Sequence, residues 1–332
     1  MNGGPARVLD ALRRAGDDPC SGETLSARRG VSRAQVWKDV EALRSRGYTI
    51  DAAPGGGYRL VSAPDRLYSE EIAAALGTKW LGCEIHHLEC TDSTNRVALE
   101  LARDGCAHGT SVIAEAQTAG RGRMGRSFYS PPYANLYTSI VLRPVAPVTD
   151  APAWILASAV GVANALVETL GRAEGVEIKW PNDVLIGGHK TCGILTELGA
   201  EGARISFLVV GIGVNLNVDP ASFPDEFRGR ATSVAHGSGG PIDRVRFTQR
   251  LYRQLERAFD ACAESGFDAL RPHFERYFAM AGQPVHVQGL DGTQIRGTAL
   301  GIDDDGALRI LTSGGETRRV IAGDVTIAKE PR

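Results

Sequence analysis

The sequence has few of the features that mark secreted, metal-binding or membrane proteins. Its six cysteines, at positions 20, 83, 90, 106, 192 and 262, are scattered, without a Cys-x-x-Cys pair or a His/Cys spacing typical of a metal site. No apolar run approaches the roughly 18 residues that a membrane helix needs, and the N-terminus lacks the apolar core of a signal peptide. We therefore expect a reduced, cytoplasmic protein without disulfides, without a protein-held metal and without a membrane partner.

Charge is nearly balanced over the whole chain but not along it. The 332 residues carry 37 Lys/Arg and 39 Asp/Glu, a net charge of −2. Residues 1–62 hold ten Lys/Arg and seven Asp/Glu, which gives +3, so the remainder carries −5. The length suffices for two or three globular domains, and the basic end is where a polyanionic partner is expected.

The basic end has the pattern of a winged helix-turn-helix. Apolar residues recur at helical spacing over residues 5–15, 21–30 and 32–46. Two strand-like runs then flank residues 54–57, which predicts a β-hairpin wing. The second helix of such a pair enters the DNA major groove with its N-terminal residues, here Ser32, Arg33, Gln35 and Lys38. The alternative is a small helical protein-interaction module, but the wing and the positive charge favour DNA.

Residues 120–126, Gly-Arg-Gly-Arg-Met-Gly-Arg, form what we call the arginine loop. Its glycines spell the GxGxxG dinucleotide fingerprint, which requires a helix directly after the loop. Pro131 and Pro132 exclude that helix, and no acidic residue for a ribose occurs between Glu115 and Asp150. We therefore expect a loop between two strands.

The guanidinium groups of this loop suit carboxylate and phosphate. Three neighbouring cations repel one another, so the loop is expected to be mobile when empty and ordered around a bound anion. The alternative is a solvated basic turn.

Three further segments draw attention. Asp92-Ser93-Thr94-Asn95 begins a helix, where it either caps the helix or faces a ligand. Lys190 follows a glycine turn, as a solvated edge charge or as a cation that pairs with phosphate. Glycines alternate along the strand-like run 208–217, which indicates that something packs close to its backbone.

The order of elements predicts an α+β protein with an antiparallel or mixed sheet. A long apolar helix over residues 151–170 is expected in its core. From residue 283, short strands at close spacing predict a small β-barrel. We place the domains at 1–63, 64–280 and 281–332.

Taken together, these blocks resemble the bacterial bifunctional biotin–protein ligase and biotin operon repressor family over nearly the full length. The matching segments are Ser32-Arg33-Ala34 with Lys38, the wing at 54–58, residues 92–95, 114–126, 130–137, Lys-Trp-Pro-Asn-Asp at 179–183, 190–197 and 211–215. The arginine loop and Lys-Trp-Pro-Asn-Asp are the most specific of these.

The resemblance implies a winged helix-turn-helix, a catalytic domain like class II aminoacyl-tRNA synthetases and lipoate ligases, and an SH3-like barrel. It implies that biotin reacts with ATP to give biotinyl-5′-AMP, with Mg²⁺ on the phosphates. A lysine of the biotin carboxyl carrier protein of acetyl-CoA carboxylase then takes up the biotin. It further implies biotinyl-AMP-dependent repression at operator DNA and a homodimer that forms on adenylate binding, through a strand edge of the central domain.

By resemblance, the biotin and adenylate site consists of Ser93, Thr94, Asn95, Gln117, Gly120, Arg121, Gly122, Arg123, Lys190, Gly193, Gly211, Gly213 and Asn215. Residues Arg126, Lys179, Trp180 and Asn182 are implied for ATP and the lid. Arg123 and Lys190 would act on the biotinyl carboxylate and the α-phosphate. Asp183 would shape the nucleotide and metal region or, alternatively, serve as the base for the incoming lysine.

Two positions depart from the family pattern: Phe128 stands where tryptophan is usual, and Met124 where many members are basic or aromatic. Two alternative functions stay open beside the ligase–repressor, a DNA-binding biotin sensor without ligation and a ligase with little or no repressor role. A lipoate ligase is a third, which the winged domain and the arginine loop disfavour.

Overall fold

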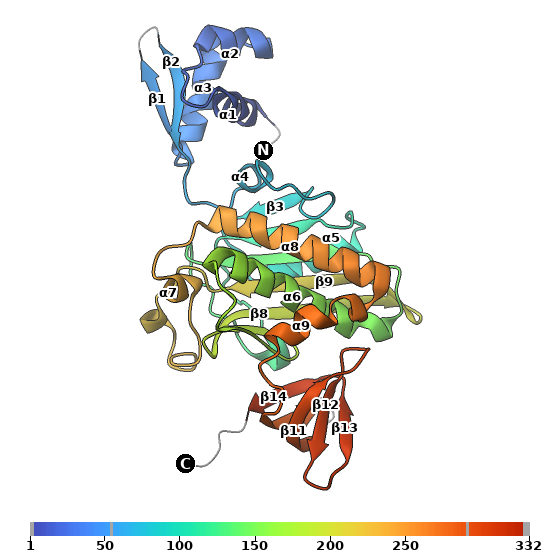
Figure 1. Ribbon diagram of the computed structural model, residues 1–332. Coiled ribbons are helices and arrows are strands. Elements are labelled where there is room, and N and C mark those ends of the chain that lie inside the picture. Colours follow the sequence, from blue (N-terminus) through green and yellow to red (C-terminus); the bar gives the residue numbers. More distant parts are fainter. Residues whose placement is uncertain (1–2, 54–55, 290–291, 328–332) are drawn as a thin grey trace. The chain divides into compact units, whose positions relative to one another are not determined.

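The computed structural model describes residues 3–53, 56–289 and 292–327 (Figure 1). The chain divides into two compact units, Met1–Glu71 and Ile72–Arg332. The first unit extends past the boundary predicted after residue 63, because Tyr68 belongs to its hydrophobic core.

The first unit is the predicted winged helix-turn-helix. Its elements are α1 (Gly4–Ala15), α2 (Gly22–Arg29), α3 (Arg33–Ser45), β1 (Thr49–Ala53) and β2 (Gly57–Ser62). The hydroxyls of Ser21 and Ser32 cap α2 and α3, and Gly30 ends α2 in the left-handed conformation. Strands β1 and β2 pair antiparallel as the wing, while Pro54 and Gly55 of its predicted turn lie outside the described residues.

The segment after the wing is held on this unit. Tyr68 stacks on Tyr48 with ring centroids 6.4 Å apart, and the Arg46 guanidinium lies 3.9 Å from the Tyr68 ring. Arg13 pairs with Glu71. The helix predicted over residues 68–76 is shorter in the structure, where α4 spans only Ser69–Ala73.

The second unit is built on a seven-stranded mixed sheet, as predicted. Its strands are β3 (Ile85–Leu88), β4 (Ser111–Ala114), β5 (Leu136–Leu142), β6 (Val176–Lys179), β7 (Asp183–Ile186), β8 (His189–Glu201) and β9 (Arg204–Val214), in the order β3-β4-β5-β9-β8-β7-β6. Only β3 and β4 pair in parallel among these neighbours. Strand β9 ends at Val214, three residues before the predicted end at Asn217.

Helices cover both faces of this sheet. They are α5 (Thr94–Arg103), α6 (Ala151–Leu170), α7 (Val234–Ser238), α8 (Arg244–Ser265) and α9 (Arg271–Tyr277). Successive residues of β5 point to opposite faces: Thr138 bonds to Tyr252 of α8, whereas Ser139 bonds to Asn95 of α5. The helix predicted over 267–277 is broken, because a short 3₁₀ turn, Phe267–Ala269, precedes α9.

Helix α6 corrects one expectation from the sequence. The segment Val148–Leu170 is long and apolar enough to span a membrane by length and composition alone, although no such run was expected. Most of this segment is buried, and α6 lies along α8 in Figure 1. It is therefore a core helix, as predicted for residues 151–170.

The C-terminal barrel has five antiparallel strands. They are β10 (Pro284–Gly289), β11 (Gln294–Ile302), β12 (Leu308–Thr312), β13 (Thr317–Val320) and β14 (Gly323–Ile327), in the order β13-β12-β11-β10-β14. The prediction found the first three, placed the fourth at Val320–Ile321, which overlaps β13 only at Val320, and missed β14. Val285, Val287, Ile310 and Val325 are buried in its interior.

A buried ion pair joins α8 to the strand that leads into the arginine loop. Nη1 of Arg244 lies 2.8 Å from Oε2 of Glu115, and both side chains are fully buried. Arg244 also donates to the backbone oxygen of Asn135, at the start of β5. Because each ion compensates the other in a low dielectric, removal of one leaves the other buried and uncompensated.

We therefore expect Arg244→Met to lower the free energy of unfolding by about 3–5 kcal/mol, measured by urea denaturation. Arg250→Met is the matched control on the same helix: Arg250 is partly exposed and lies 3.5 Å from Glu168. That pair is expected to contribute less than about 1 kcal/mol. Equal losses in the two variants would contradict the role given to the buried pair.

Candidate functional site

The arginine loop is seated beside the start of α5. Gln117 and Thr91 form an isolated parallel bridge, and the backbone N–H of Ala119 donates to the oxygen of Asp92. The loop then closes on itself, because the N–H of Phe128 donates to Gly120 and Arg121 bridges to Ser127. This backbone pairing brings the loop to the Ser93–Asn95 segment, as the resemblance implied.

Gln117 satisfies the start of α5. Its Oε1 accepts from the N–H of Thr94 at 2.9 Å and from the Thr94 hydroxyl at 3.2 Å. Its Nε2 donates to the hydroxyl of Ser130 at 3.0 Å. Ser93, at the N-cap position, makes no side-chain cap hydrogen bond, so the capping interpretation of this segment fails. Gln117 thus ties the two predicted parts of the site together.

The side-chain amide of Asn95 makes hydrogen bonds to other groups of the protein. Its Nδ2 donates to the oxygen of Leu195 and to Glu197, and its Oδ1 accepts from Ser139 at 2.6 Å. A Cβ at Gly211 would lie 1.9 Å from that Oδ1. The bare backbone predicted at Gly211 therefore receives Asn95. Both residues shape the floor of the site from within.

Phe128 lies over the other bare glycine. A Cβ at Gly213 would fall 2.6 Å from the Phe128 ring, and one at Gly193 would fall 3.4 Å from it. The prediction that something packs close to this backbone is confirmed, and in this structure it is an aromatic ring. Phe128 also meets Tyr137 edge to face, with centroids 6.4 Å apart.

The three loop arginines have different surroundings. Arg123 donates to Oδ1 of Asn182 at 3.0 Å and to the backbone oxygen of Gly323 at 3.2 Å. Arg126 pairs with Asp324. Arg121 is exposed, and no side-chain partner for it occurs among residues 3–53, 56–289 and 292–327. Arg121 is therefore the loop cation most available to an incoming anion.

Burial lowers the pKa of Arg123, and the nearby carboxylates of Asp324 and Asp183 oppose that shift. An arginine starts from so high a value that it stays charged. The guanidinium is thus a partly desolvated cation, which strengthens its attraction for an anion.

Lys190 and Asp183 form an ion pair across β7 and β8, with Nζ 2.7 Å from Oδ1. Lys190 is fixed by its backbone, which bonds to Arg230 and Thr232. The lysine is thus paired with a carboxylate while its side chain stays 39% exposed, and its role as a cation for phosphate stays a prediction. Nδ2 of Asn182 donates to Ile194, which directs its Oδ1 toward Arg123. The structure brings Arg123, Asn182, Asp183 and Lys190 into one chain of contacts.

Other predicted residues lie at its margins. Lys179 ends β6 opposite Asp183. The Nδ2 of Asn215 donates to the oxygen of Thr232, so its amide supports the backbone beside Lys190. Gly122 donates its N–H to Arg126 and helps close the loop. Trp180 is buried and bonds to the barrel.

A hollow of about 480 Å³ lies along the loop. Its lining residues are Gln117, Thr118, Ala119, Gly120, Ser127, Phe128, Tyr129, Ser130, Pro131, Pro132, Pro224, Glu226 and Phe227. Only Gln117 and Gly120 of the predicted ligand residues are among them. Phe128 borders both this hollow and the glycine face that its ring covers.

Two contact residues were missed from the sequence, Gly323 and Asp324 of β14. The barrel showed no catalytic pattern, and no signal in the sequence joins residue 324 to residue 126. Only the folded chain shows that β14 reaches the arginine loop.

The predicted DNA-contacting helix is α3. Arg33 and Lys38 are exposed, and neither has an ion-pair partner in the part of the chain that the structure describes. Gln35 is engaged within the protein, since its Nε2 donates to Asp39 at 3.0 Å. Ser32 caps the helix. Trp37 was missed: its side chain is 54% exposed, and it stands off the apolar face formed by Val36, Val40 and Leu43.

Three family models match separate parts of the chain. An HTH domain matches residues 6–59, the biotin/lipoate A/B protein ligase family matches 87–215, and the biotin protein ligase C terminal domain matches 281–327. These three matches agree with the predicted order of a helix-turn-helix, a ligase domain and a terminal barrel.

Relatives extend over nearly the whole chain. The bifunctional ligase/repressor BirA of Bacillus subtilis is 37% identical over 96% of this chain and 97% of its own length. The protein of the same name from Escherichia coli is 30% identical over 92% of each chain. The solved biotin protein ligase of Aquifex aeolicus, in complex with biotin and ATP, aligns with a TM-score of 0.64 and 27% identity over 74% of this chain and all of that chain. The sequence blocks, the fold and these relatives agree, and the chain belongs to the family of bifunctional biotin–protein ligase/repressors.

Proposed function

We propose that this chain activates biotin with ATP and transfers the biotin to a lysine of the biotin carboxyl carrier protein of acetyl-CoA carboxylase. The observation that carries the proposal is that Arg123 contacts Asn182 and Lys190 pairs with the adjacent Asp183, while the exposed Arg121 lies in the same loop as Arg123. Two anions, a carboxylate and a triphosphate, need such a group of cations to approach each other.

In the first step, an oxygen of the biotin carboxylate attacks the α-phosphorus of ATP, and the bond to the β-phosphate oxygen breaks. The products are biotinyl-5′-AMP and pyrophosphate. Arg123 and Lys190 stabilise the charge that develops on the α-phosphate, while Asn182 holds the Arg123 guanidinium in place. Arg121 holds the incoming anions at the open side of the loop.

In the second step, the neutral amine of the acceptor lysine attacks the mixed anhydride. An amide and AMP form, and the amine loses a proton. Asp183 is ion-paired with Lys190, which favours its role in holding Lys190 over the role of base. Closure of the arginine loop over the adenylate keeps water from hydrolysing the anhydride.

Mg²⁺ is proposed as the cation on the phosphates. Mg²⁺ is usually held by one or two carboxylates together with substrate phosphates and water, and Asp183 is the carboxylate that fits this role. Among the described residues, no group of three His, Cys, Asp or Glu side chains forms a metal site. Bound there, Mg²⁺ would neutralise charge on the leaving pyrophosphate.

We expect Arg123→Ala to slow biotinyl-AMP synthesis by about 10²–10³-fold, the loss typical when one preorganised donor to a developing anion is removed. The measurement is biotin-dependent pyrophosphate release, followed by the mass shift of a carrier domain incubated with biotin and MgATP. Arg103→Ala, which removes an exposed arginine at the end of α5, is the matched control and should keep the wild-type rate. A wild-type rate in Arg123→Ala would refute the role given to the loop.

The same mass shift decides between the ligase and the alternatives. A wild-type protein that binds operator DNA without labelling a carrier would be a biotin sensor only. Competition between biotin and lipoate separates a biotin ligase from a lipoate ligase.

We propose a second role, repression of biotin synthesis genes at operator DNA in the presence of biotinyl-AMP. It is supported by the exposed Arg33 and Lys38 on α3 and by the relatives named ligase/repressor. Operators for helix-turn-helix proteins mirror a two-fold protein axis, so we propose that the adenylate drives dimerisation through a sheet edge. Its test is sedimentation velocity with and without biotinyl-AMP. A cytoplasmic location follows from these roles.

We expect Arg33→Ala to weaken operator binding by about 1–3 kcal/mol, the range for loss of one base-contacting arginine. Arg14→Ala, in which an exposed arginine of α1 loses its pair with Asp10, removes the same charge and should have little effect. The measurement is a binding titration on operator DNA at fixed salt, with biotinyl-AMP present. Equal weakening in both variants would point to non-specific attraction by charge.

A further inference from the structure

We propose that the C-terminal barrel positions residues 180–183, which we call the catalytic turn, through one buried hydrogen bond. In this bond the indole N–H of Trp180 donates to the backbone oxygen of Gly306. Trp180 is then a positioning residue for adenylate formation and has no direct contact with ATP. The proposal rests on the proposed ligase function.

Trp180 can act in this way because it directly precedes the residues that contact Arg123 and Lys190. It precedes Pro181, Asn182 and Asp183 in the turn between β6 and β7. Asn182 receives Arg123, and Asp183 receives Lys190. The indole itself is only 2% exposed, and its Nε1 lies 3.0 Å from the Gly306 oxygen. A shift of the indole would therefore move the residues that hold both catalytic cations.

Gly306 is fitted to this contact. Its φ of 83° lies in the left-handed region, which favours glycine. A Cβ there would fall 2.9 Å from the Leu156 side chain of α6. The barrel turn thus rests on a core helix and on Trp180 at once, with no room for a larger residue.

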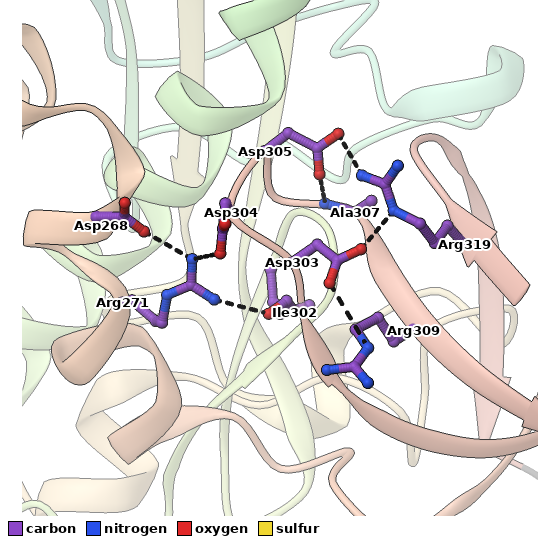
Figure 2. A network of polar contacts seen from close by, with 9 residues as sticks. All are labelled: Asp268, Arg271, Ile302, Asp303, Asp304, Asp305, Ala307, Arg309 and Arg319. Atoms are coloured by element: carbon purple, nitrogen blue, oxygen red, sulfur yellow. Dashed lines mark hydrogen bonds and ion pairs between the residues drawn. The ribbon is translucent and has the colours of Figure 1, made fainter. Parts of the chain in front are cut away.

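Arginines brace the same turn from outside, and Figure 2 shows the network. Asp303 pairs with Arg319 and lies 3.6 Å from Arg309. Asp305 accepts from Arg319 at 2.6 Å. Asp304 pairs with Arg271 of α9. Each of the three consecutive aspartates is therefore paired with an arginine, and Asp303 and Asp305 share Arg319, so this acidic run is a brace and not a cation site.

Arg271 links residues 303–306 to the segment that leads into α9. Its Nη1 donates to the oxygen of Ile302 at 3.1 Å, and its Nη2 lies 2.7 Å from Asp268. Burial favours the neutral form of Asp305, but the hydrogen bonds from Arg319 and from the N–H of Ala307, together with the charge of Arg319, lower the pKa of Asp305. The carboxylate stays ionised at neutral pH. Exposed pairs of this kind contribute little stability each, so their effect is to fix the geometry of residues 303–306.

Removing the indole N–H while keeping a ring tests the proposal. In Trp180→Phe the Gly306 oxygen loses its donor, and the turn loses its direct hydrogen bond to the barrel. Because a displacement of about 1 Å can cost 10²-fold in rate, we expect single-turnover adenylate formation to slow by about 10–100-fold. KM for biotin should change by less than about threefold, since Trp180 does not contact biotin.

Trp154→Phe is the matched control. Trp154 is also nearly fully buried, 4% exposed, and it packs against Phe259 away from the catalytic turn. It should keep the adenylation rate within about threefold. Thermal unfolding of both variants reports any general loss of packing.

Arg271→Ala provides a second test should Trp180→Phe fail to fold. It removes the contacts of Arg271 with Asp304, Asp268 and the Ile302 oxygen but leaves Trp180 in place, and we expect adenylation to slow by about 3–10-fold with KM for biotin unchanged. The proposal is overturned if folded Trp180→Phe matches Trp154→Phe, or if Arg271→Ala keeps the wild-type rate. A wild-type protein that fails to label a carrier would overturn the ligase function itself, a separate outcome.

Discussion

The constraint on which this structure depends is the assembly of like charges before their ligand arrives. In the proposed reaction two anions bind to Arg121, Arg123, Arg126 and Lys190, and these like charges repel one another until the anions arrive. The chain offsets this repulsion locally: Asn182 and the Gly323 oxygen accept from Arg123, and Asp183 and Asp324 pair with Lys190 and Arg126. Arg121 alone is left without such a partner in the described chain. The site is thus preorganised, with one cation held open.

Those compensating groups come from two separate parts of the second unit, the central sheet and the barrel. Asn182 and Asp183 belong to the central sheet, and Gly323 and Asp324 belong to the barrel. A barrel without a catalytic side chain can still set the position of Arg123. The same barrel reaches the Asn182 turn from a second direction, through Trp180 and Gly306. Both ends of the Arg123–Asn182 contact therefore depend on where the barrel sits.

The sequence predicted the elements well where local chemistry decides them. Helical spacing and serine caps found α1 to α3, and the glycine pair at 187–188 found the turn between β7 and β8. It also singled out Gln117 and Lys190, which the structure places beside Thr94 and Asp183. It could not find Asp324 or the tie of Trp180 to Gly306, because these contacts join residues 198 and 126 positions apart. It could not show that Asn95 of α5 packs directly against the bare backbone of Gly211 in β9.

The polar contacts of this molecule are of two kinds, which differ in how far apart their partners lie along the chain. Local contacts cap the ends of helices and could be inferred from spacing alone. An example is the hydrogen bond from the N–H of Gln35 to the Ser32 hydroxyl. Long-range contacts, such as Glu115 with Arg244 beneath the loop, fix where one element meets another. A cation group can keep its geometry only if such long-range contacts over-determine it, because mutual repulsion acts to spread it apart. The buried pair of Glu115 with Arg244 and the contacts of the loop with Gly323 and Asp324 of the barrel supply these constraints. The loop glycines, with their freedom to move, then need to close only over Arg121 and the bound anion.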